Sequence, residues 1–331
     1  MKANRHASGV KKQPVNSMLF TPFRPMGPVL AKTVPVGPKL LYQMKWDGVR
    51  IIAHVGGGKL MLHNRQLRMR TDHYPELSCL GELLEDEAIF DGELVALKDG
   101  RPSFSLVLER DLITPASGLP EDARVRRLMQ KVPVNYMVFD LVWFKGENLM
   151  SRSLRERQAI LGEILPETDH VHLVESFTDG EALFAAVSEK KLEGIVAKEA
   201  DAPYYPGRKH PAWKKVKVRQ KQLVAIGGYT VKDGRINALL AGAYRYGRFV
   251  YLGRVATGLS GNDLVHLSPF LQASVRKTPP FANATGGRGK VWVEPKLVAL
   301  VDFQEWTEDL RMRQPVIKGF TRNEPDDCIL G

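Results

Sequence analysis

The sequence predicts an α+β protein in which a domain of antiparallel sheets with helices is followed by a small all-β barrel. Residues 18–219 mix strand-like runs with helical segments, which is typical of an α+β domain. Residues 220–331 repeat short strand-like runs separated by tight turns, which is typical of a barrel. The 331 residues are enough for two ordinary domains, and 44% of them are hydrophobic, as in globular proteins.

The first domain is predicted to contain two β-hairpins, further strands and several helices. Strand-rich segments between residues 40 and 64 flank the Gly56-Gly57-Gly58 turn, which predicts the first hairpin. The Asp99-Gly100 pair predicts a second hairpin that continues into Ser103-Phe104. We expect further strands at 88–97, 134–144, 193–198 and 212–218, and helices at 77–84, 153–165 (with a Ser cap) and 180–189.

The second domain has the strand pattern of a Greek-key barrel of the oligonucleotide-binding (OB) type. Turns are expected at Asp233-Gly234 and Tyr246-Gly247, one helix at 262–270, and a loop at 275–290. The expected strands are 224–230, 238–244, 249–255, 291–299 and 301–306. We place the domain boundary after Arg219, and we expect the polar, basic residues 1–17 to form a flexible tail.

The composition favours a polyanionic partner and argues against a membrane or disulfide-rich protein. The formal net charge of +11 makes nucleic acid the first candidate, although a generally basic enzyme would have the same charge. Cys79 and Cys328 lack metal-binding or disulfide spacing, which fits a reducing compartment. Neither an apolar run of membrane-spanning length nor a signal-peptide core occurs. We expect a cytoplasmic monomer without membrane contact.

The strongest functional signal is the segment 45–50 (KWDGVR). Alone, K-x-D-G is a weak pattern, because a surface strand end with an Asp-Gly turn has the same letters. Four further motifs follow it in order, and together they make the series specific. These motifs are 90–94 (FDGEL), 138–141 (VFDL), 192–198 (LEGIVAK) and 213–217 (WKKVK).

This ordered series resembles the motifs of the covalent nucleotidyltransferase superfamily, which comprises ATP-dependent DNA ligases, RNA ligases and mRNA capping enzymes. Further segments are similar to the minimal bacterial ligases that form the ligase component of end-joining systems. They are 204–209 (YYPGRK), 226–230 (IGGYT), 253–258 (GRVATG) and 303–307 (FQEWT). The likeness covers residues 22–325, and it implies a nucleotidyltransferase (adenylation) domain followed by an OB-fold domain.

The resemblance implies that Lys45 carries AMP covalently and that Asp47 orients Lys45 or the reacting end of the nick. A nucleophilic lysine must be neutral, whereas a free lysine is protonated at neutral pH. Burial or neighbouring positive charge must therefore lower its pKa. Lys215 and Lys217 alternate on a strand, so both can point into one pocket. The resemblance assigns them to the triphosphate; the alternative for such a lysine-rich strand is a solvated face.

The resemblance also implies how the nucleotide is bound. Gln43 contacts adenine through its backbone, and adenine stacks on Phe139, for which core packing is the alternative role. Arg50 and Arg65 bind the nucleotide and the 5′-phosphate of the nick, since a guanidinium donates forked hydrogen bonds. Asn64 stands where most relatives have Ser, and we expect it to donate a hydrogen bond.

Two carboxylates and two further cations complete the implied site. Glu93 contacts the ribose, and Glu93 and Glu193 help to hold a divalent metal, Mg²⁺ or Mn²⁺, that prefers oxygen ligands. Lys209 is assigned to the nucleotide. Arg322 is assigned to the leaving pyrophosphate, although segment 322–325 (RNEP) departs from the family's R-x-D-K ending.

Together these features imply an ATP-dependent DNA ligase that seals nicks between a 5′-phosphate and a 3′-hydroxyl through a covalent lysyl-AMP, in DNA repair or end joining. ATP and Mg²⁺ or Mn²⁺ are the expected cofactors; nicked duplex DNA and a DNA-end-binding repair protein are the expected partners. We expect a minimal stand-alone enzyme associated with a bacterial nucleoid. An RNA ligase or capping enzyme using the same Lys45, and a degenerate module that binds nicks without sealing them, are the alternatives.

Overall fold

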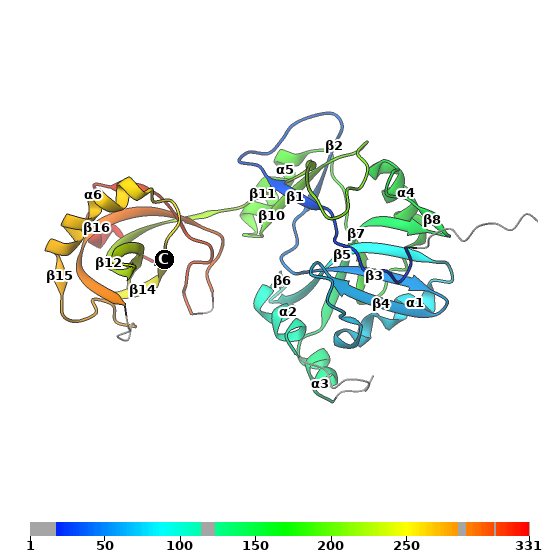
Figure 1. Ribbon diagram of the computed structural model, residues 1–331, viewed down its shortest axis with the longest axis horizontal. Helices are drawn as coiled ribbons and strands as arrows, with labels where there is room; N and C mark the ends of the chain where they lie inside the picture. Colours follow the sequence, from blue (N-terminus) through cyan, green and yellow to red (C-terminus); the bar gives the residue numbers. More distant parts are fainter. Residues whose placement is uncertain (1–17, 114–122, 284–288, 308, 331) are drawn as a thin grey trace, which may run out of the picture. The chain divides into compact units, whose positions relative to one another are not determined.

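The computed structural model describes residues 18–113, 123–283, 289–307 and 309–330 (Figure 1). The chain forms two compact units, of which the first ends at Val216 and the second begins at Lys217. The boundary that the sequence suggests after Arg219 stays a prediction. No helix in the described ranges has both the length and the apolar character needed to cross a membrane.

A seven-stranded sheet forms the centre of the first unit. Its main path is β4-β3-β5-β7-β8, while β6 pairs with β5, and β9 pairs with β7 in parallel. Its strands are β3 (Val49–Gly56), β4 (Lys59–Asn64), β5 (Ala88–Lys98), β6 (Arg101–Pro102), β7 (Val134–Phe144), β8 (Glu147–Asn148) and β9 (Val171–Leu173).

Both faces of this sheet are buried. On β3, Ile51 and Ala53 pack into one hydrophobic core, whereas Ile52 packs into another that also contains Met26 and Trp213. Successive side chains of a strand point to opposite faces, so β3 contributes to both cores. A strand that is buried on both faces has a nearly continuous run of apolar residues, and this run is why β3 could be predicted from the sequence.

A second, four-stranded sheet has the order β1-β11-β10-β2. Its strands are β1 (Gly27–Leu30), β2 (Leu40–Met44), β10 (Gly194–Glu199) and β11 (Lys209–Lys217). The predicted first hairpin is confirmed for β3 and β4, with Gly57 and Gly58 at positive φ in the turn. The preceding strand β2, however, pairs with β10 and belongs to this other sheet. The chain therefore changes sheets between Met44 and Val49, inside the K-x-D-G motif.

Helices pack on both sheets, the last of them on β2 and β10 of the four-stranded sheet, and some of them were missed from the sequence. They are η1 (Thr71–His73), η2 (Pro75–Ser78), α1 (Cys79–Leu83), α2 (Phe104–Asp111), α3 (Ala123–Lys131), α4 (Leu154–Ile164) and α5 (Gly180–Glu189). Ser153 caps α4 as predicted, in a capping box with Glu156. The second hairpin is confirmed, because β5 pairs with β6 across the Asp99-Gly100 turn. Its expected continuation into Ser103-Phe104 was wrong, because the strand ends at Pro102 and α2 begins at Phe104. Its inner face buries Arg110, which pairs with Glu76 at 2.8 Å, so its apolar periodicity is weak.

The second unit has the topology predicted for an OB barrel. Its elements are β12 (Gln220–Lys232), β13 (Arg235–Arg245), β14 (Arg248–Val255), α6 (Gly261–Ala273), β15 (Val275–Arg276), β16 (Lys290–Phe303), β17 (Val316–Thr321) and η3 (Pro325–Asp327). Their order is β14-β13-β12-β16-β15, with β17 on β16. A parallel bridge between Thr257 and Val316 brings the end of β14 back to β17 and closes the barrel.

Two details of this unit differ from the sequence-based expectation. The strands expected at 291–299 and 301–306 are one continuous strand, β16, and the strand β17 was missed. The predicted turns are confirmed, because Asp233-Gly234 and Tyr246-Gly247 all have positive φ. The turns could therefore be predicted from their local residues. The full length of β16 could not, because it depends on pairing with the distant strand β12.

Candidate active site

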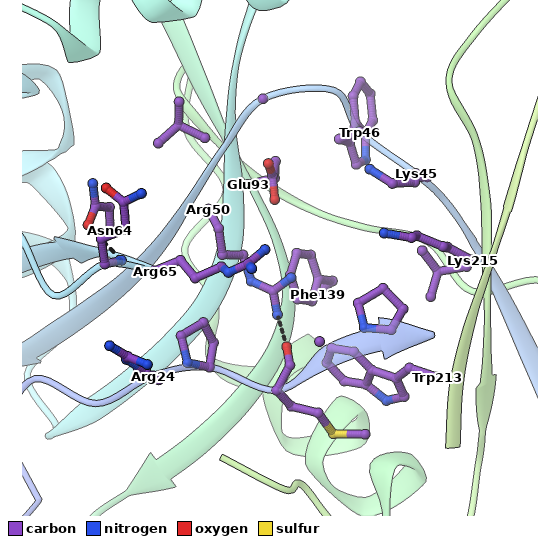
Figure 2. Close-up of a pocket in the computed structure, with 18 of the residues that line it drawn as sticks. Arg24, Lys45, Trp46, Arg50, Asn64, Arg65, Glu93, Phe139, Trp213 and Lys215 are labelled. Carbon is purple, nitrogen blue, oxygen red and sulfur yellow. Dashed lines mark hydrogen bonds between the residues drawn. The ribbon is translucent and has the colours of Figure 1, made fainter. Parts of the chain in front are cut away.

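A pocket of about 920 Å³ in the first unit gathers most of the predicted site residues (Figure 2). It is lined from both sheets, because β2, β10 and β11 contribute on one side and β3, β5 and β7 on the other. The predicted residues that line it are Gln43, Lys45, Arg50, Arg65, Glu93, Phe139, Lys209 and Lys215.

Lys45 lies just beyond the end of β2, where its backbone N–H donates to the carbonyl oxygen of Gly194 at 2.9 Å. This pairing places the side chain beside Glu193, and Lys45 Nζ is 2.5 Å from Glu193 Oε2. The Glu193 side chain is 5% exposed and that of Lys45 is 21% exposed, so the amine remains accessible from the pocket. The predicted nucleophile and a predicted metal ligand are thus direct neighbours.

Gly48 explains why the K-x-D-G motif requires a glycine. A Cβ at this position would collide with the carbonyl oxygen of Leu94 on β5. The chain can change sheets here only because the two backbones approach this closely. Asp47 lies in the same connection but is not among the pocket-lining residues.

Arg50 is held by Asp91, a residue that the sequence analysis quoted in a motif but did not assign. Its Nε and Nη2 are 2.5 and 2.7 Å from the two carboxylate oxygens, and its guanidinium lies 4.3 Å over the Phe139 ring. Burial alone would lower the pKa of Arg50, but the Asp91 charge raises it above its ordinary value. Tyr204 donates to Asp91 Oδ2 at 2.6 Å and fixes the carboxylate from the other side.

Lys198 is a pocket residue that sequence reasoning missed, although it ends the LEGIVAK motif. It is 3% exposed, and its Nζ has no hydrogen-bond partner within the described part of the chain. The amine lies 4.3 Å from the centre of the Phe139 ring and 4.2 Å from that of Trp213. Burial lowers the pKa of Lys198 to about 7, so a substantial neutral fraction exists at neutral pH.

Glu93 lies opposite Arg50 in the register of β3 and β5. Burial raises the pKa of Glu93 to about 7, against the lowering effects of Lys45 and Arg50. The nearby carboxylates of Glu193 and Asp91 add to the rise. A carboxyl group poised near neutrality is common in functional sites, where it gains charge when a cation or a hydroxyl arrives.

Asn64 organises the loop that presents Arg65. Its Oδ1 accepts hydrogen bonds from the backbone N–H groups of Gln66 at 2.9 Å and Arg68 at 3.1 Å. The expected donation by the Asn64 amide nitrogen stays a prediction, whereas the carbonyl oxygen of the same side chain accepts from the backbone. The loop exposes the guanidinium groups of Arg65 and Arg68 at the pocket.

The remaining predicted residues differ in position. Gln43 is 2% exposed, its side-chain amide donates to Ser176 Oγ at 3.0 Å, and the residue lines the pocket. Lys217 donates to Gln304 Oε1 at 3.0 Å within the second unit and is not among the pocket-lining residues. Arg322 is exposed in the second unit. The roles predicted for Lys217 and Arg322 stay predictions.

The carboxylates fit a divalent metal that also binds phosphate. Among the described residues, no group of three or more His, Cys, Asp or Glu side chains could hold a metal alone. Mg²⁺ is usually held by one or two carboxylates together with substrate phosphates. Glu193, next to Lys45, and Glu93 supply this kind of incomplete donor set.

Two family models match this chain. Residues 18–217 match the model of the ATP dependent DNA ligase domain, and residues 232–324 match that of the ATP dependent DNA ligase C terminal region. This chain belongs to the ATP-dependent DNA ligases. The predicted family and the predicted fold class, a nucleotidyltransferase domain followed by an OB-fold domain, are confirmed.

The relatives of this ligase include end-joining proteins. It is 33% identical over 288 residues to the multifunctional non-homologous end joining DNA repair protein LigD of Mycobacterium tuberculosis, covering 84% of this chain and 35% of the relative. It is 28% identical to a DNA ligase of Thermococcus onnurineus, covering 93% of this chain and 56% of the relative. The chain therefore spans about a third of the length of the LigD relatives.

Solved structures give the same assignment. The structure of mycobacterial DNA ligase D complexed with ATP and MES is similar with a TM-score of 0.54 and 29% identity. The match covers 93% of this ligase and 98% of that chain. The ligase domain of M. tuberculosis LigD matches with the same TM-score and 28% identity.

Proposed function

We propose that this ligase seals nicks in duplex DNA by carrying AMP on Lys45. The observation that carries the proposal is the position of the Lys45 amine, held by Glu193 at the wall of a pocket that contains an aromatic platform and several cations. A lysine in this setting can form a phosphoramidate with the α-phosphate of ATP.

The first step forms a bond between Lys45 Nζ and the α-phosphorus and breaks the bond from that phosphorus to pyrophosphate. Phe139 supports adenine, and Lys198 lies beside it between two aromatic rings. Arg50 and Lys215 provide positive charge where negative charge develops. Asp91 keeps Arg50 in place, so little reorganisation is required during the reaction.

In the second step AMP passes from Lys45 to the 5′-phosphate of the nick, and in the third the 3′-hydroxyl attacks that phosphate and releases AMP. The loop organised by Asn64 presents Arg65 for the 5′-phosphate. Glu193 and Glu93 would hold Mg²⁺ or Mn²⁺, which would supply positive charge for the phosphate oxygens. Asp47, Lys209, Lys217 and Arg322 belong to the same proposal through the family motifs.

The decisive experiment is incubation with α-labelled ATP and Mg²⁺, followed by a denaturing gel. Wild-type protein is expected to carry the label, and Lys45→Ala is expected to lose it. A label that persists in Lys45→Ala would show that another residue is the nucleophile. Lys39→Ala is the matched control, because Lys39 is exposed and pairs with Asp201 outside the pocket.

The substrate and the pathway need separate tests. We propose nicked DNA as the substrate, repair or end joining as the process, and the bacterial nucleoid as the location. A DNA-end-binding protein is the proposed partner, and the LigD relatives support this pathway. Sealing of nicked DNA should exceed sealing of nicked RNA, and ATP should label the chain in preference to GTP. Equal sealing of both nicks would contradict the DNA assignment.

A further inference from the structure

We propose that His54 and His63 form a buried relay of hydrogen bonds that positions the loop carrying Arg65. His63 acts through the backbone of Asn64, so it is a positioning residue and not a catalytic one. The inference rests on the proposed function, because Arg65 is the residue proposed there for the 5′-phosphate of the nick. It gives a role to two histidines that belong to none of the motifs that located the site.

The two histidines are neighbours on one face of β3 and β4. Ile52 lies opposite His63 in the register of these strands, and His54 lies on the same face of β3 as Ile52. Both histidines are fully buried, and their Nε2 atoms are 3.2 Å apart. The rings of Phe20 and Phe23 pack on His54, with ring centroids 6.4 and 6.1 Å from its own. The imidazole nitrogens therefore meet away from solvent, where each polar atom needs a partner.

Backbone groups at the two ends of the pair determine which nitrogen of each ring carries the proton. The N–H of Phe20 donates to His54 Nδ1 at 3.1 Å, so this nitrogen is unprotonated. The proton of His54 is then on Nε2, and it donates to His63 Nε2. His63 in turn carries its proton on Nδ1, which donates to the carbonyl oxygen of Asn64 at 3.1 Å. All three bonds form only when both rings are neutral.

The surroundings keep both rings neutral. Burial lowers the pKa of His54 from 6.5 to about 3, and the neighbouring His63 adds to the fall. Burial also lowers the pKa of His63, although its bond to Asn64 and the charge of Asp91 oppose the fall. Protonating either ring would place two hydrogens between atoms that now share one. The relay is therefore complete at neutral pH.

The first end of the relay fixes the segment that leads to the pocket. Phe20 has a φ of +60°, which is uncommon for a bulky residue and persists only where the surroundings enforce it. Its N–H bond to His54 and the packing of its ring supply that support. Further along this segment, the carbonyl oxygen of Met26 accepts from Arg50 Nη2 at 3.3 Å. The relay thus begins in a segment that also contacts the nucleotide pocket.

The second end of the relay holds the loop that carries Arg65. The carbonyl oxygen of Asn64 accepts from the N–H of Leu67 at 2.9 Å as well as from His63, and Leu67 has a φ of +66°. Because His63 and Leu67 share this oxygen, the His63 ring fixes the peptide at which the turn begins. Figure 2 shows Arg65 extending from beside Asn64 toward Arg50. A guanidinium on a preorganised loop binds phosphate with less loss of entropy.

The first test compares two replacements of His63 that separate packing from hydrogen bonding. His63→Phe keeps a ring but removes the donor to Asn64, whereas His63→Asn loses the ring and keeps an amide donor near the position of Nδ1. Transfer of AMP from the adenylated full chain to nicked DNA should slow about tenfold in His63→Phe. His63→Asn should retain most of this rate, although its melting temperature should fall further. The opposite order of rates would refute the relay, because packing alone would then explain the effect.

The second test asks whether His63 acts through Arg65. In a double-mutant cycle, His63→Phe should add less than about twofold to the loss of rate caused by Arg65→Ala. Losses that multiply independently would contradict the proposal. His172→Phe is the matched control, because His172 bonds to Asn135 Oδ1 at 3.1 Å on β9 and is not among the pocket-lining residues. It should leave the transfer rate unchanged.

Amide hydrogen exchange tests the relay without any reaction. The N–H groups of Gln66, Leu67 and Arg68 all donate to Asn64, and they should exchange about tenfold faster in His63→Phe. His54→Phe should also raise these rates, so the test does not depend on one variant. Unchanged exchange in both variants would overturn the relay. Failure of the wild type to accept AMP would overturn the proposed function alone, because exchange needs neither ATP nor DNA.

Discussion

Replacing Glu93 by Gln should stabilise this ligase while impairing its reaction. Burial raises the pKa of Glu93 from the ordinary value of 4.5 to about 7. Above pH 7 the folded protein must therefore hold a buried negative charge that the unfolded chain holds in water. Glutamine has a similar shape and no charge to bury, so Glu93→Gln removes this cost and also the predicted ribose and metal contact.

The magnitude follows from the pKa. One pH unit corresponds to about 1.4 kcal/mol, so the rise to about 7 amounts to roughly 3 kcal/mol. The folded state keeps a proton between pH 4.5 and 7 that the unfolded state releases, so the free energy of unfolding of the wild type falls across this window. The advantage of Glu93→Gln should be near zero below the window and about 3 kcal/mol above it.

Urea unfolding of wild type and variant, compared from about pH 4 to about pH 9, measures this difference. Hydrogen exchange of amides in β3 and β5 should be the readout, because these strands report on the first unit alone. Labelling by α-labelled ATP should meanwhile fall in the variant. A stability difference that does not change with pH would refute the reasoning, since the burial of a charge would then not be its cause.

Three further changes test the packing around the pocket. Lys198→Met should raise the free energy of unfolding most below pH 7 and progressively less toward pH 10.5, because burial lowers the pKa of Lys198 to about 7; urea unfolding across pH measures this. Arg157→Met should cost about 3 to 5 kcal/mol, because it leaves the fully buried Asp140 carboxylate without its partner; denaturant midpoints check it, and a cost below about 1 kcal/mol would contradict it. Gly48→Ala should slow self-adenylation by at least about tenfold, because its Cβ would collide with the Leu94 backbone; unchanged labelling would contradict the close approach.

Much of the fold was readable from local patterns. The strands β3, β5 and β7 appeared as apolar runs because both of their faces are buried. The turns appeared because positive φ selects glycine and its neighbours. By contrast, α2 was missed because its inner face carries the buried Arg110, whose partner Glu76 lies in a different element. No local pattern reveals that such a charge is neutralised.

The residues of the candidate site were also only partly predictable from the sequence. The motif series located Lys45, Glu93, Phe139 and Lys215, and the structure brings these four together in one pocket. Lys198 is part of one of those motifs. Its burial beside the Phe139 and Trp213 rings could not be predicted, because these rings lie on β7 and β11 whereas Lys198 lies on β10. Its lack of a hydrogen-bond partner among the described residues follows from that packing, which no sequence pattern contains.

By itself, the sequence determined the family and the order of the two domains, because each depends on residue types at short spacing. It also predicted Lys45 as the nucleophile, which stays a prediction. The tertiary structure decided that the K-x-D-G motif is the crossing between two sheets, and that Asp91 and Tyr204 hold Arg50. It also joined Arg24 to the distant loop at Gly207. These are contacts between segments far apart in the chain, and only the folded backbone sets which distant segments meet.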